Sequence, residues 1–204
     1  NETHDWMTTA QVTALYTQNP DAFVTGATLE LYLQSDMNTV PQTISITSAG
    51  QMVQLGTAAH PLVAGATYVL KETTVPPHYR RAANLSFTVT AATNGLTIPM
   101  VDPKIAYRPI QVQKNWSGTE RAAVSFDLYL AGQSTPLDSV QLAADDADGI
   151  AVFPGTASIC YNNQYPLTDA EGTALVYTVT ERALDGYYTA TAAHTTTDTD
   201  ALLQ

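Results

Sequence analysis

A strand-like segment that ends in a glutamate occurs twice in the chain. Residues 68–79 read Tyr-Val-Leu-Lys-Glu-Thr-Thr-Val-Pro-Pro-His-Tyr, and residues 175–188 read Leu-Val-Tyr-Thr-Val-Thr-Glu-Arg-Ala-Leu-Asp-Gly-Tyr-Tyr. Both begin with β-branched and aromatic residues, reach the glutamate, pass through turn residues and end at a tyrosine. Because side chains alternate along a strand, Glu72 and Glu181 each point the same way as the tyrosine four residues earlier. Each carboxylate is therefore directed toward a core, where it needs a partner.

A second repeat predicts the domain organisation. Residues 28–33 (Thr-Leu-Glu-Leu-Tyr-Leu) match residues 125–130 (Ser-Phe-Asp-Leu-Tyr-Leu), in the same order relative to the glutamate segments. The repeats are about a hundred residues apart, which is the size of a small domain. The other segments are short β-type runs separated by turn residues, as in β-sandwiches. We predict an all-β chain of two tandem immunoglobulin-like β-sandwiches, residues 1–106 and 107–204, with residues 142–146 as the only candidate helical turn.

Composition excludes several classes of partner. The net charge is −11, with only eight basic residues in 204. This argues against binding to nucleic acid and to anionic membranes. The single cysteine, Cys160, cannot form an internal disulfide and is expected to be a small buried hydrophobe. We find no signal peptide and no transmembrane run, so we expect a mature fragment without membrane insertion.

Several motifs give the chain a family resemblance. In residues 110–199 they are Val-Gln-Lys-Asn-Trp at 112–116, Asp-Ser-Val-Gln-Leu at 138–142, Pro-Leu-Thr-Asp-Ala-Glu-Gly at 166–172, Tyr-Thr-Val-Thr-Glu at 177–181 and Gly-Tyr at 186–187. In residues 10–104 they are Gly-Ala-Thr-Leu-Glu-Leu-Tyr at 26–32, Tyr-Val-Leu-Lys-Glu-Thr at 68–73 and Met-Val-Asp-Pro-Lys at 100–104, with Pro76 and Tyr79. The second half resembles a Cna-B-type domain of Gram-positive adhesins and pilins, and the first half resembles the related pilin variety.

The resemblance implies a covalent cross-link in the second half. Many members join a lysine on the first strand to an Asn or Asp on the last by an isopeptide bond, which a glutamate promotes. On this sequence the resemblance assigns the amine to Lys114, the acyl group to Asp198 and the promoting (catalytic) role to Glu181. Asp198 stands where the family usually has Asn. No cofactor is implied.

The residues around Lys114 support this reading independently. Alternation places Lys114 on the same strand face as Ile110, Val112 and Trp116. A lysine on an apolar face is rarely left unpaired. Two alternatives to a cross-link stay open, a lysine that extends to the edge of the sheet and a buried Lys–Glu ion pair.

The first half carries a degenerate version of the same site. Glu72 and Asp102 match the family motif, but the lysine position holds Tyr16, which a strand would place on the face of Val12 and Ala14. A phenol cannot replace the amine, so we expect no cross-link there. The two acids would instead share a proton or hydrogen-bond to Tyr16.

Three other features were considered as sites. Residues 145–149 (Asp-Asp-Ala-Asp-Gly) resemble a calcium loop but lack its distal glutamate, so we expect an inter-strand turn. The four histidines are scattered without zinc-ligand spacing, and we expect no metal site. Lys104 follows a proline, as does the lysine to which sortases join the next subunit in pilin shafts; the plainer interpretation is a solvated linker lysine.

The function that these features favour is structural. We expect a stalk subunit of a pilus or adhesin, located outside the cell on a Gram-positive cell wall, with other surface subunits as partners. The alternative is an adhesin module that contacts a host matrix protein or glycan through loops such as residues 34–42 or 158–165. An enzyme is disfavoured because no polar constellation for turnover is recognisable.

Overall fold

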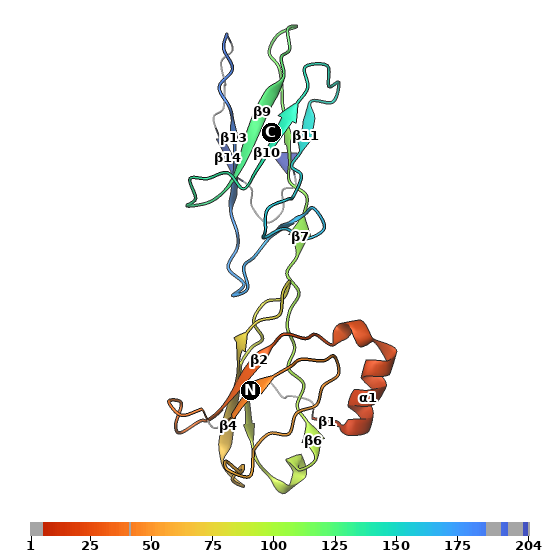
Figure 1. Cartoon of the computed structure of the whole chain (residues 1–204), viewed down its shortest axis with the longest axis vertical. Helices are drawn as coiled ribbons and strands as arrows, with labels where there is room; N and C mark the ends of the chain where they lie inside the picture. The colour runs from red at the N-terminus through yellow and green to blue at the C-terminus, as the bar shows by residue number, and fades with distance from the viewer. Residues whose placement is uncertain (1–5, 41, 187–192, 196–201, 204) are drawn as a thin grey trace. The chain divides into compact units, whose positions relative to one another are not determined.

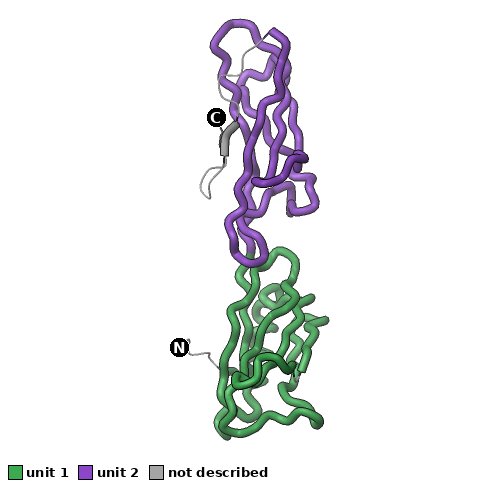
Figure 2. The backbone as a smooth tube through the Cα atoms, turned by 90° about the vertical axis from the view of Figure 1, so that its left-hand side faces the viewer, with its two compact units in different colours: residues 1–104 green, residues 105–204 purple. Residues whose placement is uncertain are grey.

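The computed structural model describes residues 6–40, 42–186, 193–195 and 202–203. The chain divides into two compact units, Asn1–Lys104 and Ile105–Gln204, coloured separately in Figure 2. Both units consist mainly of antiparallel strands, drawn as arrows in Figure 1. The prediction of an all-β, sandwich-type fold is therefore confirmed, with one exception in the first unit described below.

The first unit is built on a four-stranded sheet. Its strand order is β3-β2-β4-β5, and β1 pairs with β6 in a separate two-stranded ribbon. The strands are β1 (Met7–Thr8), β2 (Thr28–Leu33), β3 (Gln42–Ser45), β4 (Thr67–Thr74), β5 (Leu85–Thr88) and β6 (Leu96–Thr97), with 3₁₀ turns at Pro20–Ala22 and Ala91–Thr93. Inward residues of the sheet, such as Leu31, Leu70 and Phe87, form the core, against which Trp6 and Ile98 pack from outside the sheet.

The second unit is a sandwich of two sheets. One sheet has the order β10-β9-β13-β14, the other has the order β11-β8-β15, and β7 pairs with β12. The strands are β7 (Tyr107–Arg108), β8 (Gln111–Gln113), β9 (Val124–Leu130), β10 (Asp138–Leu142), β11 (Ile150–Val152), β12 (Tyr165–Pro166), β13 (Tyr177–Glu181), β14 (Ala193–Thr195) and β15 (Leu202–Leu203). The core joins Leu128 and Val179 of the first sheet to Val112 and Ala151 of the second.

The sequence repeats occupy equivalent positions in the two sheets. Strand β2 lies between β3 and β4, as β9 lies between β10 and β13. Leu29 pairs with Glu72 in the first unit, and Phe126 pairs with Glu181 in the second. The next inward pairs are Leu31–Leu70 and Leu128–Val179, followed by Leu33–Tyr68 and Leu130–Tyr177. The two glutamates therefore occupy the same register on equivalent strands; Glu181 ends β13, and β4 continues past Glu72 to Thr74.

A helix replaces the strand that the sequence predicts for residues 12–16. Helix α1 (Thr9–Gln18) begins at a capping box, in which the Thr8 hydroxyl accepts from the Gln11 N–H and the Gln11 side chain accepts from the Thr8 N–H. It ends before Pro20, where a proline ring blocks further helix. Figure 1 shows α1 beside β1 and β6. Within α1 only Val12 is buried, so the alternation that suggested a strand does not define a buried face.

The remaining helical expectation is also corrected. Residues 143–146 form a hydrogen-bonded turn, in which the Asp146 N–H donates to the Ala143 carbonyl, and no helix follows. In the described part of the chain, no helix is both long and apolar enough to span a bilayer.

Candidate functional site

The centre of the candidate site is a partly buried ion pair between Lys114 and Glu181. The Lys114 Nζ lies 2.9 Å from Glu181 Oε1 and 2.7 Å from Oε2. The two side chains are only 14% and 11% exposed. The Lys114 Nζ also lies over the indole ring of Trp116, 4.9 Å from the ring centroid. The electron-rich face of an indole ring attracts a cation at this distance. The amine is thus held by a carboxylate and screened by an aromatic ring.

Backbone pairing places both members of this pair. Glu181 ends β13, where its position opposite Phe126 of β9 fixes its strand face. Lys114 follows β8 directly, and its N–H donates to the Gly149 carbonyl at 2.7 Å, which extends the β8–β11 ladder by one residue. The two residues come from different sheets of the sandwich and meet at the margin of one core.

The geometry decides between the alternatives that the sequence left open for unlinked Lys114. A lysine that extends into solvent does not fit an exposed fraction of 14%, whereas a buried Lys–Glu pair does. A cross-link uses the same two groups, because the short Nζ–Oε2 contact is a path for a proton from the ammonium to the carboxylate. The expected bond itself stays a prediction.

The third residue of the expected cross-link, Asp198, lies outside the described residues. The strand that follows it in the sequence, β15, runs parallel to β8 and places Leu202 opposite Gln111 and Leu203 opposite Val112. The strand that directly precedes Lys114 and the last strand of this unit are therefore neighbours.

The three residues of the predicted degenerate site lie on different elements of the first unit: Tyr16 on α1, Glu72 on β4 and Asp102 after β6. Tyr16 lies on α1, not on a strand; its ring packs edge-on against Phe23 at 5.2 Å and lies beside Gly50. Glu72 is buried, with 3% exposure, and its Oε2 accepts a hydrogen bond from the Ala82 N–H at 2.8 Å. A backbone amide thus contacts the carboxylate that, at the same register in the second unit, contacts a lysine. The strand placement of Tyr16 was wrong because local capping outweighs the alternating pattern.

Asp102 and Lys104 lie near the end of the first unit. Asp102 is half-buried, and this burial raises the pKa of its carboxyl. Lys104 is exposed, forms an isolated β-bridge with Tyr79, and holds its Nζ 6.0 Å from the Tyr79 ring centroid. The neighbouring Arg80 N–H donates to the Pro103 carbonyl at 2.7 Å. Lys104 therefore lies on a segment that backbone contacts hold to residues 79 and 80.

A buried polar cluster in the second unit was not predicted from the sequence. The Asp138 carboxylate accepts hydrogen bonds from the Tyr165 hydroxyl at 2.5 Å and from the Thr156 hydroxyl at 2.6 Å. The Tyr165 hydroxyl in turn accepts from the Gly155 N–H at 3.0 Å. Burial, with this carboxylate alongside, strongly raises the pKa of Tyr165. No spacing motif joins these residues, so only the fold reveals the cluster.

A second polar group was missed on the outer side of the same sheet. The Arg182 guanidinium donates two hydrogen bonds to Asp127, at 2.7 and 2.6 Å, and Ser139 donates a third at 2.5 Å. Arg182 lowers the pKa of Asp127 by these hydrogen bonds. The sequence did indicate that Asp127 points to the outer face, because it lies between the apolar residues Phe126 and Leu128 in a strand-like run.

The structure supports neither a reactive cysteine nor a metal site among the described residues. Burial raises the pKa of the Cys160 thiol to about 11, so the thiol stays protonated near neutral pH. Within the described ranges, no three His, Cys, Asp or Glu side chains are grouped to hold a metal ion.

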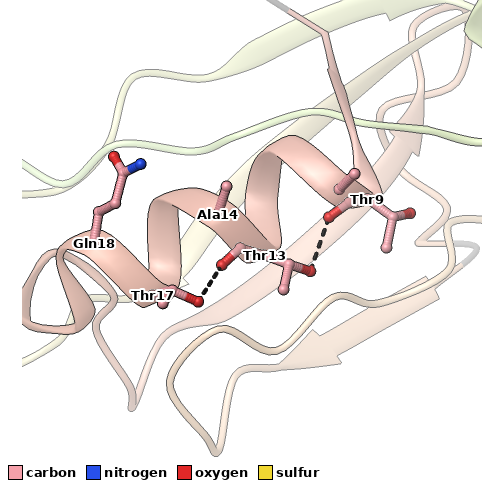
Figure 3. Close-up of a pocket in the computed structure, with 6 residues that line it drawn as sticks. Thr9, Thr13, Ala14, Thr17 and Gln18 are labelled. Atoms are coloured by element: carbon pink, nitrogen blue, oxygen red, sulfur yellow. Dashed lines mark hydrogen bonds between the residues drawn. The ribbon is translucent and has the colours of Figure 1, made fainter.

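A surface hollow of about 720 Å³ runs along α1 (Figure 3). It is lined by Thr9, Ala10, Thr13, Ala14, Thr17 and Gln18. Figure 3 shows two of its hydroxyls bonded back into the helix, from Thr13 to the Thr9 carbonyl and from Thr17 to the Thr13 carbonyl. The hollow is therefore lined mainly by small methyl groups and the Gln18 amide, and these groups indicate no particular ligand or reaction.

The chain thus consists of two mainly β units, one of which holds a partly buried lysine–glutamate contact. No protein-family model matches the chain, and no curated protein matches it. Among solved structures, it is similar to the shaft pilin SpaA of Lactobacillus rhamnosus GG, at 14% identity over 88% of this chain and 86% of that one, with a TM-score of 0.35. A C-terminal fragment of the pilus adhesin SpaC from the same bacterium matches at 14% identity over 87% and 73%, also with a TM-score of 0.35. At this similarity neither structure assigns a function to the chain.

Proposed function

We propose that the chain is a structural subunit of a pilus or adhesin stalk on the surface of a Gram-positive bacterium. In this proposal the second unit is closed by an intramolecular isopeptide bond between Lys114 and Asp198, promoted by Glu181. The observation that supports it is the partly buried Lys114 amine, which donates to both carboxylate oxygens of Glu181. The sequence resemblance to Cna-B-type domains supplies the expected reaction.

The reaction is a single condensation. Glu181 accepts a proton from the Lys114 ammonium across the 2.7 Å contact, which leaves a neutral amine. The amine attacks the carboxyl carbon of the acyl partner, one C–N bond forms, one C–O bond breaks, and one water leaves with the protons that Glu181 transfers. The pairing of β15 with β8 supports the proximity that an activating cofactor would otherwise provide. The chain performs this step once on itself and is not an enzyme with turnover.

Asp198 is the acyl partner that the sequence resemblance indicates. It belongs to the segment that follows Arg182, and peptide mapping of the linked species identifies the acyl residue.

Intact mass spectrometry tests the bond. Wild-type chain should weigh one water less than its sequence, whereas Lys114→Arg and Glu181→Gln should both have full sequence mass. Arginine keeps a positive charge near Glu181 but cannot be acylated in this way. Lys114→Arg therefore removes the reaction without removing the charge. A wild-type chain of full mass would contradict the proposal.

A stalk role also requires subunits to be joined, and Lys104 is the candidate acceptor. It is exposed and stands on a segment held by the Tyr79 bridge, although a solvated linker lysine remains the plainer interpretation. Incubation with a sortase and a sorting-signal peptide should label wild-type chain at Lys104 and leave Lys104→Arg unlabelled. Labelling that is unchanged in Lys104→Arg would remove this residue from consideration.

An adhesin role is the second candidate, and one loop favours it. Asn162 and Asn163 have positive φ angles of 51° and 59°, as in a tight hairpin turn, and Tyr161 beside them is 46% exposed. Exposed tyrosines on rigid turns are common binding anchors. An array of immobilised matrix proteins and glycans should then show a signal that Tyr161→Ala abolishes; an empty array favours the purely structural role.

A further inference from the structure

The acidic turn at residues 145–149 contacts the backbone of the proposed reactive lysine. Gly149 is buried at the end of this turn, and its carbonyl accepts the Lys114 N–H at 2.7 Å. The Lys114 carbonyl approaches the same glycine so closely that a Cβ at residue 149 would stand 2.8 Å from that oxygen. Gly149 has a φ of +65°, a conformation that residues with side chains rarely adopt. Both backbone polar atoms of Lys114 thus face one glycine.

The rest of the turn holds Gly149 in that conformation. One oxygen of Asp146, Oδ1, accepts the N–H groups of Asp148 and Gly149 at 3.1 and 2.9 Å. The Asp146 carbonyl accepts a hydrogen bond from Arg121 at 3.0 Å. These contacts connect the loop before β9 and the β10–β11 turn to the end of β8. The motif that resembled a calcium loop therefore has a different explanation, because its carboxylate oxygen is used on its own backbone.

We infer that Gly149, held by Asp146, is a positioning residue for Lys114, which sets the reach of the lysine amine toward Glu181 and the acyl partner. This inference rests on the proposed cross-link for its consequence, but the positioning itself is independent of that bond. A side chain at residue 149 would displace the backbone of Lys114, and small misplacements of a reacting group slow a reaction strongly. Asp146 acts one step further away, through the conformation of the glycine.

The rate of water loss after a pulse of cell-free synthesis tests the inference. Gly149→Ala should form the bond on the order of tenfold to a hundredfold more slowly than wild type. Gly132→Ala is the matched control, since Gly132 has a similar φ of +83° and no atom within 4 Å of the added Cβ. Its rate should equal that of wild type. Equal rates for the two alanine variants would overturn the inference.

A second pair of variants covers the case in which Gly149→Ala does not fold. Asp146→Asn keeps an acceptor oxygen for the two N–H groups and should retain the wild-type rate, whereas Asp146→Ala removes the acceptor and should be slow. A stabilising role alone would lower the melting temperature of Asp146→Ala without changing the rate in its folded fraction. That result would also overturn the inference.

A third readout works without any cross-link. Lys114 in unlinked chain, either the Glu181→Gln variant or wild type if it retains full mass, should react slowly with acetic anhydride because it is held in the core margin. Adding Gly149→Ala should accelerate acetylation of Lys114, measured by peptide mass, and adding Gly132→Ala should not. Full wild-type mass together with this pattern would reject the cross-link and keep the positioning role; no acceleration would reject the positioning role.

Discussion

At the scale of single residues, the Tyr165 hydroxyl joins two polar groups inside the second unit. It donates to Asp138 and accepts from the Gly155 N–H, and the tyrosine is fully buried. Tyr165→Phe removes the acceptor of the Gly155 N–H and leaves Asp138, among the described residues, with only its hydrogen bonds from Thr156, which should cost about 1–3 kcal/mol of unfolding free energy. The second unit contains a single tryptophan, Trp116, so urea unfolding of a Trp6→Phe background reports this unit alone.

The matched control for this substitution is Tyr161→Phe. Tyr161 is exposed, so losing its hydroxyl should leave the unfolding midpoint nearly unchanged. Equal midpoints for Tyr165→Phe and Tyr161→Phe would show that the buried cluster does not stabilise the fold.

Asp127 should give the second unit a distinct sensitivity to acid. Arg182 holds the pKa of Asp127 below its ordinary value, so the carboxylate stabilises the fold above that ordinary value, about pH 4. This contribution is lost as the pH falls from there through the lower pKa of the folded state. Asp127→Asn should therefore be less stable near neutral pH and should lose less stability on acidification.

Urea midpoints measured from pH 7 down to about pH 2 check this expectation. Asp145→Asn changes the same charge on an exposed turn residue and should keep the wild-type slope. If Asp127→Asn also kept the wild-type slope below pH 4, the ion pair with Arg182 would not be the source of the acid sensitivity.

At the scale of elements, the two central strands should be equally important to their own units. Leu31 of β2 and Leu128 of β9 occupy equivalent positions, and both are completely buried. Leu31→Ala or Leu128→Ala should each cost about 2–5 kcal/mol, because a cavity adds to the lost burial. Since the two cores consist of different residues, Trp6 fluorescence should report only the first substitution and Trp116 only the second. A substitution that shifts both transitions equally would contradict this separation.

The same elements show how far sequence reasoning reaches. Alternation over residues 177–181 and 68–72 placed both glutamates on inward faces, and alternation also placed Lys114 at the core margin. The pairing of Glu181 with Lys114 was implied by the family resemblance and not by alternation. The register between β9 and β13 could not be predicted from the sequence, because short strands of similar composition can pair in several ways.

Helix α1 shows where such reasoning fails. Residues 12, 14 and 16 alternate in a way that fits a strand, but the capping box at Thr8 and the proline at residue 20 favour a helix. The polar clusters around Asp138 and Asp127 were missed for another reason, since their members come from strands and loops far apart in sequence. Only tertiary contacts bring them together.

At the scale of the whole molecule, the proposed bond should make the two units unequal. A link from Lys114 to Asp198 closes a loop of about 85 residues, which by analogy with disulfides stabilises the second unit by about 4–5 kcal/mol. We expect no such link in the first unit, where Tyr16 stands at the lysine position. Limited proteolysis should therefore degrade the first unit before the second, and Lys114→Arg should reduce the difference. Equal rates for both units in wild type would contradict it.

The chemical state of Lys114 tests the central claim most directly. Trypsin cannot cut after an acylated lysine, and no lysine or arginine lies between Arg182 and Gln204. A digest of wild-type chain should therefore yield a branched species, in which residues 105–121 are joined through Lys114 to the peptide that begins at Ala183, and its mass should be one water below the sum. Fragmentation of this species identifies the acyl residue. Recovery of separate peptides that end at Lys114 and begin at Asn115 would show an unmodified lysine and contradict the account.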